Sequence, residues 1–178
     1  MSQAPRLPYA WGATEADLAR SYPADTMLDG PTISATRAVH VDAPVELTYR
    51  WLCQTAVAPY SYDLLDNAGR RSPQQLTPGA DHLVAGQRVM VFELTDVQPG
   101  RQWSGLTYPA AARIFGALAA TYAVEPDRDG SRLVCRLVVS QRGPLGWVRS
   151  RLLAWGDLVM MRKQFLTLKG LAERDARV

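Results

Sequence analysis

The sequence predicts an α+β fold in which a curved antiparallel sheet wraps around one long C-terminal helix. The first observation is the segment 143–178, where apolar residues recur at steps of three and four after a Gly-Pro break and no further proline follows. The second is a run of alternating, β-branched segments joined by short turns containing Pro and Gly, which is typical of hairpins. The third is the order of these elements, which separates the strands from the long helix.

The composition is that of one globular domain. The chain has 178 residues, of which 47% are apolar and 21% charged. Its net charge of +3 is spread along the sequence, which argues against a dedicated nucleic-acid binder. Cys53 and Cys135 lie far apart in apolar segments, so we expect two buried, reduced thiols. The sequence lacks the pattern of a signal peptide and an apolar run long enough to span a membrane, so we expect a cytoplasmic protein without stable membrane insertion.

We divide the chain into an N-terminal arm, residues 1–31, and a single domain, residues 32–178. The arm contains four prolines, but its aromatic residues predict that it packs on the domain surface. Within it, Thr14 and Asp17 have the spacing of a capping box that opens a short helix through residue 20. A disordered lead-in is the alternative.

The first half of the domain predicts one strand and two short helices. Residues 32–41 alternate and are rich in β-branched side chains, as in a strand. Residues 45–55 continue at helical spacing after Pro44, which is favoured in the first turn of a helix. A second short helix is expected over residues 62–68, because Gly69 is a suitable residue to end it.

The second half predicts antiparallel hairpins followed by the long helix. Turn-forming residues separate segments of alternating pattern. The expected strands are 88–97, 101–107, 118–125 and 131–141. Residues 108–116 interrupt the pattern and predict a loop or a short helix at the mouth of the sheet. The long helix is expected from about Pro144 onward.

Several motifs extend this order into a family resemblance. They are Thr36-Arg-Ala-Val-His-Val-Asp-Ala-Pro44, Trp51-Leu-Cys-Gln54, Tyr60-Ser-Tyr-Asp-Leu-Leu-Asp-Asn67, Val84-Ala-Gly-Gln-Arg-Val89 and Val97-Gln-Pro-Gly-Arg101. With the opening Trp11-Gly-Ala-Thr14, the chain resembles the START-like or SRPBCC superfamily, which includes polyketide cyclases, aromatases and lipid-transfer domains. The resemblance implies the helix-grip fold and a bacterial subgroup without an assigned function. It carries no set of catalytic residues to this sequence, because one such scaffold supports binders, carriers and enzymes.

The long helix supplies the first candidate site residues. At about 100° per residue, Arg151 and Arg162 fall in the same sector as Trp155 and its apolar neighbours, whereas Asp157 and Gln164 fall outside it. We therefore expect Arg151, Trp155 and Arg162 to face a ligand pocket, where arginine suits a carboxylate or phenolate. The alternative is that both arginines extend to solvent from the edge of the sector or pair with an acidic side chain.

Other candidates lie at a predicted helix start and on strands. Tyr62 and Asp63 combine a phenol with a carboxylate and are able to perform acid–base chemistry, and the alternative is helix capping and packing. Glu93 faces either a cavity or solvent. Trp103 and Tyr122 are candidate cavity walls with polar tips, and core packing is their alternative.

No motif predicts a metal site or a cofactor. The two histidines, His40 and His82, form no cluster with cysteine, and the sequence contains neither a phosphate-binding glycine loop nor a nucleophile elbow. A basic amphipathic membrane-surface helix over residues 147–169 is a further alternative.

Three functions remain open from the sequence. The first is the binding of a small hydrophobic molecule (a polyketide, an aromatic or a lipid-like compound) in a cavity between the sheet and the long helix. The second is an enzyme of the cyclase/aromatase type that uses the same cavity. The third is a structural or interaction role in which side chains fill the cavity. The oligomeric state is open.

Overall fold

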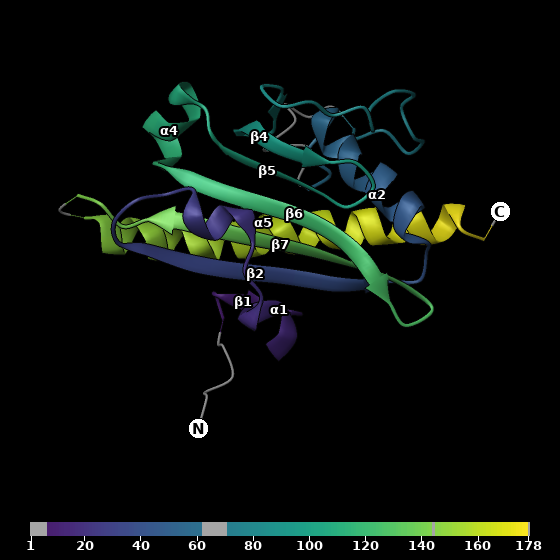
Figure 1. The fold of residues 1–178 in the computed structure, drawn as a ribbon, viewed down its shortest axis with the longest axis horizontal. Coiled ribbons are helices and arrows are strands. Elements are labelled where there is room, and N and C mark those ends of the chain that lie inside the picture. The colour runs from purple at the N-terminus through teal and green to yellow at the C-terminus, as the bar shows by residue number, and fades with distance from the viewer. Residues whose placement is uncertain (1–6, 62–70, 144, 178) are drawn as a thin grey trace.

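The computed structural model describes residues 7–61, 71–143 and 145–177. In this part of the chain, seven strands form one sheet in the order β1-β2-β7-β6-β5-β4-β3, and only the β1–β2 pair is parallel. The strands are β1 (Ala10–Trp11), β2 (Thr32–Val41), β3 (Arg88–Val89), β4 (Phe92–Gln98), β5 (Gln102–Thr107), β6 (Leu118–Asp127) and β7 (Gly130–Ser140). Figure 1 shows the sheet curving along the C-terminal helix. This is the predicted helix-grip fold, which is therefore confirmed.

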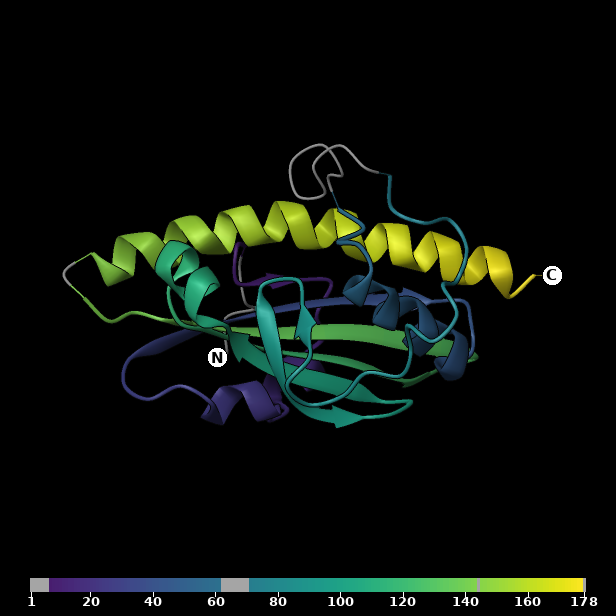
Figure 2. The same ribbon diagram turned by 90° about the horizontal axis from the view of Figure 1, so that it is seen from above.

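The C-terminal helix α5, Gly146–Asp175, has 30 residues and so extends for about 45 Å. Figure 2 shows it running along one face of the sheet, with α2 beside its C-terminal half. The shorter helices are α1 (Glu15–Ala19), η1 (Pro23–Thr26), α2 (Val45–Cys53), η2 (Gln54–Ala56) and α4 (Pro109–Phe115). The helix predicted over residues 62–68 lies outside the described residues.

Both faces of β6 and β7 are buried, and alternate side chains serve different cores. Leu137 points into the main core, which also contains Phe165 of α5, whereas the next residue, Val138, packs on the opposite face with Ala24 of η1. The N-terminal arm therefore covers the face of the sheet that α5 leaves open (Figure 2). This arrangement explains why apolar residues occupy consecutive positions in these strands, as in Leu137-Val138-Val139. Burial of a side chain such as Phe165 stabilises the fold by roughly 2–3 kcal/mol.

Charged side chains of β7 fix the arm in place. The Thr14–Asp17 capping box is confirmed, and the side-chain oxygens of Asp17 accept hydrogen bonds of 3.0, 3.1 and 2.5 Å from Arg132. The Nη2 atom of Arg136 donates to the backbone carbonyls of Asp17, Leu18 and Arg20. The free backbone carbonyl groups at the C-terminal end of α1 thus receive hydrogen bonds from a strand residue that is more than 100 positions away in sequence.

The predicted strand over residues 88–97 is wrong as one continuous element. It breaks into β3 and β4 at Met90, whose φ of 53° lies in the left-handed region. β3 folds back on β4, pairing Val89 with Phe92. Residues 109–115 form α4, with Pro109 in its first turn, which was one of the two predicted alternatives.

Cys53 and Cys135 are both buried free thiols, as predicted. Cys53 lies at the end of α2 and Cys135 in the middle of β7, and both belong to the main core.

Candidate functional site

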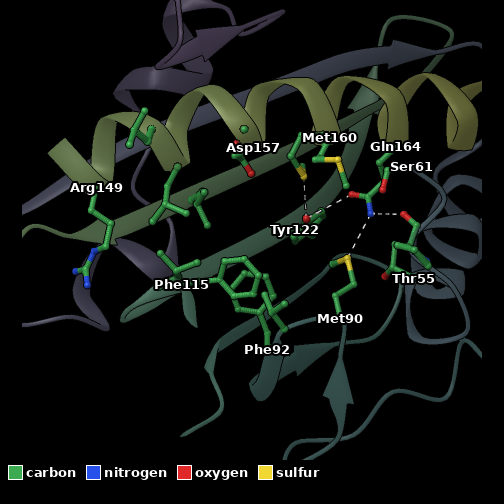
Figure 3. Close-up of a pocket in the computed structure, with 18 of the residues that line it drawn as sticks. Thr55, Ser61, Met90, Phe92, Phe115, Tyr122, Arg149, Asp157, Met160 and Gln164 are labelled. Carbon is green, nitrogen blue, oxygen red and sulfur yellow. Dashed lines mark hydrogen bonds between the residues drawn. The ribbon is translucent and has the colours of Figure 1, made fainter. Parts of the chain in front are cut away.

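A pocket of about 900 Å³ opens between the N-terminal half of α5 and the sheet. Its wall is mainly apolar. It is built from five parts of the chain: the segment after α2 (residues 55–61), the β3–β4 hairpin, α4, the ends of β6 and β7, and α5. Figure 3 shows these side chains converging from the different elements. The volume lies within the range of small-molecule sites, about 300–1,000 Å³.

Local backbone features leave this space open. Gly156 of α5 lines the pocket, and a Cβ added there would meet no atom within 4 Å. The turn at Met90 directs the β3–β4 hairpin so that Met90, Val91 and Phe92 all contribute to the wall. The pocket is therefore open at this end of α5, whereas Phe165 and Leu168 close the core farther along the helix.

Asp157 brings a carboxyl group to the apolar wall. Its Oδ2 atom lies 3.0 Å from Nη2 of Arg37, which projects from β2 and is fully buried. The contact is an ion pair without hydrogen-bond alignment, because Oδ2 accepts no hydrogen bond from the described residues. Burial raises the pKa of Asp157 to about 6, although the charge of Arg37 and its side-chain contact act in the opposite direction. The side chain keeps 19% of its surface exposed, so a ligand is able to reach it (Figure 3).

Tyr122 and Gln164 form a second polar group in the pocket. The phenol of Tyr122 donates to Sδ of Met161 at 3.0 Å and to Oε1 of Gln164 at 3.4 Å. The amide of Gln164 donates to the carbonyl of Pro59 at 2.6 Å and to Sδ of Met90 at 3.3 Å. Burial raises the pKa of Tyr122 well above its ordinary value, so the phenol stays neutral and serves as a donor.

Arg149 provides a cation at the other end of the pocket (Figure 3). Its Nη2 atom donates to the carbonyl of Ser140 at 3.3 Å. Its guanidinium lies against Gly116, where an added Cβ would come within 2.8 Å of it. Among the described residues, no carboxylate forms an ion pair with Arg149. The pocket thus presents a carboxyl group near its middle and an uncompensated guanidinium at one end.

The predicted orientation of the long helix is wrong. Arg151 and Arg162 are exposed, Trp155 is 47% exposed, and none of the three lines the pocket. Arg162 instead lies over the ring of Trp11 in β1 at 5.9 Å. The prediction failed because α5 is apolar on both its inner and its outer face, and the three- and four-residue spacing of apolar residues does not distinguish the two faces.

The other predicted residues have different positions. Tyr122 lies in the pocket wall, and Trp103 stacks behind it with ring centroids 4.3 Å apart and no access to the pocket. Glu93 is exposed on β4, which agrees with its solvent-facing alternative. Tyr62 and Asp63 lie outside the described residues.

Asp157, Gln164 and Arg149 line the pocket but were not predicted as site residues. A signal for the first two was present, because the residues on the inner face of α5, at alternating steps of four and three, include small and polar side chains as well as apolar ones. They are Ser150, Ala154, Asp157, Met161, Gln164 and Leu168. A helix face with this composition is typical of a wall that contacts a cavity and not a dry core.

The described residues include neither a candidate metal site nor a candidate membrane span. They contain no group of three or more His, Cys, Asp and Glu side chains placed to hold a metal ion. Within the same ranges, none of the helices has both the length and the apolar character required to cross a bilayer.

Comparisons with known proteins support the fold only. No family model matches the chain, and no curated protein matches it in sequence. Among solved structures, protein MLL2253 of Mesorhizobium loti is 17% identical, with a TM-score of 0.51 over 79% of this chain and 97% of that one. SA2116 of Staphylococcus aureus, a protein of unknown function, is 9% identical, with a TM-score of 0.50 over 83% of this chain and 98% of that one.

A polyketide-related structure is also similar. The di-domain ARO/CYC protein StfQ from the steffimycin biosynthetic pathway is 15% identical, with a TM-score of 0.52 over 83% of this chain. The present chain spans about half of that protein, 52% of its length. Folds of the cyclase/aromatase type are thus among those that this chain resembles, and identities this low establish no shared activity.

Proposed function

We propose that this chain binds a small apolar molecule in the pocket between α5 and the sheet, and that it is a member of the START-like superfamily. The observation that carries the proposal is the pocket of about 900 Å³, whose mainly apolar wall contains the accessible carboxyl group of Asp157. Binding sites of this kind gain affinity from apolar contact and orientation from a few polar groups. A cytoplasmic location is part of the proposal.

The polar groups define which ligands fit. Arg149 lies at one end of the pocket and Gln164 at the other, with Asp157 between them (Figure 3). A polyketide, aromatic or lipid-like compound with an acidic group at one end would place that group on Arg149 and its apolar body against Leu153, Phe115 and Val91. A hydroxyl or amide donor on the ligand would fit the accessible part of the Asp157 carboxyl group, because Oδ2 itself is buried against Arg37 while the side chain keeps 19% of its surface exposed.

The open pocket argues against the third possibility from the sequence, a filled core with a purely structural role. Side chains do close the C-terminal half of the interface around Phe165, but they leave the N-terminal half open. Unfilled space of this size in an apolar interior forfeits packing energy, so its retention favours a ligand.

Native mass spectrometry of the protein purified from its own host tests the proposal. We expect a bound species of small-molecule mass that is released on denaturation. A preparation that shows only the mass of the bare chain, and that binds no compound from an apolar extract of the same host, would contradict it.

An enzyme of the cyclase/aromatase type is the second candidate, and Asp157 favours it. A carboxyl group with a pKa of about 6 is able both to accept and to donate a proton near neutral pH. The Asp157→Asn variant should then lose turnover of the bound compound while still binding it. Turnover that is unchanged in Asp157→Asn would exclude this role.

A further inference from the structure

The outward face of α5 carries an apolar stripe that none of the described residues covers. Its members recur at alternating steps of three and four residues along the helix, with Arg162 occupying one step. The apolar members, 43–71% exposed, are Leu145, Val148, Leu152, Trp155, Val159 and Leu166. Because the opposite face of α5 packs on the sheet, the helix is apolar on two sides. A continuous exposed stripe of this length marks an interaction surface.

The stripe continues into the mouth of the pocket. Leu145, Val148 and Leu152 belong to the stripe and also line the pocket. On the other side of the mouth, α4 contributes Phe115 to the pocket wall and exposes 75% of Ile114. Apolar side chains therefore surround the pocket entrance on both helices, so a partner that covers the stripe also covers the entrance.

The charges around the stripe have one sign. Arg162 lies within the stripe, and at about 100° per residue the exposed side chains of Arg151 and Lys163 flank it on opposite sides. Asp157 is the sole acidic residue between positions 142 and 172 of the sequence, and its carboxyl group is paired with Arg37. The helix α4 adds Arg113 and has no acidic residue. The surface thus complements a negatively charged partner.

We propose that this face docks on an anionic membrane surface, with the pocket entrance directed toward the lipid. A helix with Trp and Leu on one strip and basic residues beside it is suited to lie in the interface between headgroups and acyl chains. Basic residues add electrostatic attraction to anionic lipid. Salt screens this attraction, so the protein should dissociate as the salt concentration rises. A second copy of the chain fits the stripe less well, because pairing two such helices would bring basic residues of both copies together.

Co-sedimentation with lipid vesicles tests the docking. We expect the full chain to bind vesicles of phosphatidylcholine with phosphatidylserine, to bind pure phosphatidylcholine far less, and to dissociate at high salt. The double variants Arg151→Glu/Lys163→Glu and Trp155→Ser/Val159→Ser should each weaken binding by about tenfold or more. These four positions lie outside the pocket wall, so this test is independent of ligand binding.

A charge-matched control separates this patch from net charge. Arg101→Glu/Arg128→Glu reverses two exposed arginines near strand turns at the end of the sheet away from α4 and should change binding less than threefold (Figure 1). Brominated phosphatidylcholine in the anionic vesicles should quench tryptophan fluorescence less in Trp155→Phe than in the wild type.

Equal binding by the stripe variants and the wild type would overturn the proposal, as would equal binding to both kinds of vesicle. A dimer in solution that Trp155→Ser dissociates would also overturn it, because a second copy would then be the partner.

Discussion

Nη2 of Arg37 lies 3.0 Å from Oδ2 of Asp157, and this contact joins a fully buried cation on β2 to a carboxyl group in the pocket wall. Arg37 also donates to the backbone carbonyls of Thr36 and Ala154. The guanidinium is therefore held between the central sheet and α5, and it is the charge that opposes protonation of Asp157. The ion pair thus places one polar group in the otherwise mainly apolar wall of the pocket.

The stability contributed by Asp157 should fall as pH rises. Its pKa is about 6 in the folded protein and 3.8 as an ordinary aspartate, so between these values the folded state binds more protons than the unfolded state. The free energy of unfolding should decrease across this interval, by up to roughly 3 kcal/mol relative to Asp157→Asn. Urea unfolding of both proteins at several pH values measures the difference. Parallel pH profiles for the two proteins would rule out the raised pKa.

Arg37→Met supplies the control for that experiment. Methionine keeps much of the buried volume but removes the positive charge beside Asp157. The pKa of the carboxyl group should therefore rise above about 6, and the decrease in stability should extend to higher pH. Carbon-13 NMR of the Asp157 carboxyl group would follow this titration. A midpoint that stays the same or moves lower would contradict the assigned role of Arg37.

Gln164 should hold the segment after η2 against α5. Its amide donates to the carbonyl of Pro59 at 2.6 Å, and its carbonyl accepts from Tyr122. Gln164→Met keeps the length of the side chain but loses these bonds, which should lower the free energy of unfolding by about 1–2 kcal/mol. Amide hydrogen exchange in residues 57–61 should accelerate. Exchange that accelerates only in other segments would contradict this role.

Asp17 should anchor the arm most strongly above acidic pH. Burial acts to raise its pKa, but hydrogen bonds from Arg132 and Thr14 outweigh this effect and hold the pKa below 3.8. The stabilisation is therefore present above pH 3.8 and is lost as pH falls toward the folded-state pKa. Asp17→Ala should cost about 2–3 kcal/mol at neutral pH, and the difference from wild type should shrink in acid.

Asp29→Ala is the matched control for the arm. It removes an exposed carboxylate from the same arm and should change stability by less than about 0.5 kcal/mol. Denaturation at neutral pH compares the two variants directly. Equal losses in Asp17→Ala and Asp29→Ala would mean that the contact with Arg132 contributes nothing.

Gly170 should be replaceable with a gain in stability. It is exposed in α5, and an added Cβ would meet no atom within 4 Å, so Gly170→Ala should stabilise the protein by about 1 kcal/mol. Gly116 provides the contrast, because its φ is +82° and a Cβ would come within 2.8 Å of Arg149. Gly116→Ala should therefore destabilise. Thermal denaturation distinguishes the two, and a loss of stability in Gly170→Ala would contradict the analysis of α5.

The sequence predicts the strands and the long helix well because each has a clear local signal. The alternation over residues 32–41 matches β2, and the apolar steps after the Gly-Pro break match α5. The break at Met90 lacks such a signal, because a left-handed methionine is enforced by the surrounding hairpin and not by its own preference. The parallel pairing of β1 with β2 is likewise a product of packing by the arm.

The candidate site was harder to predict because periodicity gives the spacing of a helix face but not its direction. The outer stripe with Trp155 and Val159 is as apolar as the inner face with Leu158 and Phe165. A pocket at one end of α5 also allows polar residues such as Asp157 on the inner face. This differs from the usual pattern, in which the inward face of a helix is apolar and charged residues face solvent. Tyr122 was predicted from its place on a middle strand, and its side chain lies on the face of β6 that packs on α5.

Occupancy of the pocket by a ligand is the central claim, and Gly156 gives its most direct test. Gly156→Phe should place a ring at the pocket wall, where an added Cβ meets no atom within 4 Å, whereas Gly156→Ala makes the same helix-favouring change without the ring. Native mass spectrometry of both variants, purified from the protein's own host, would compare their bound small molecules. We expect the wild type and Gly156→Ala to carry the same ligand and Gly156→Phe to lose most of it. Equal ligand content in Gly156→Phe and Gly156→Ala, or no ligand in any of the three proteins, would contradict the claim.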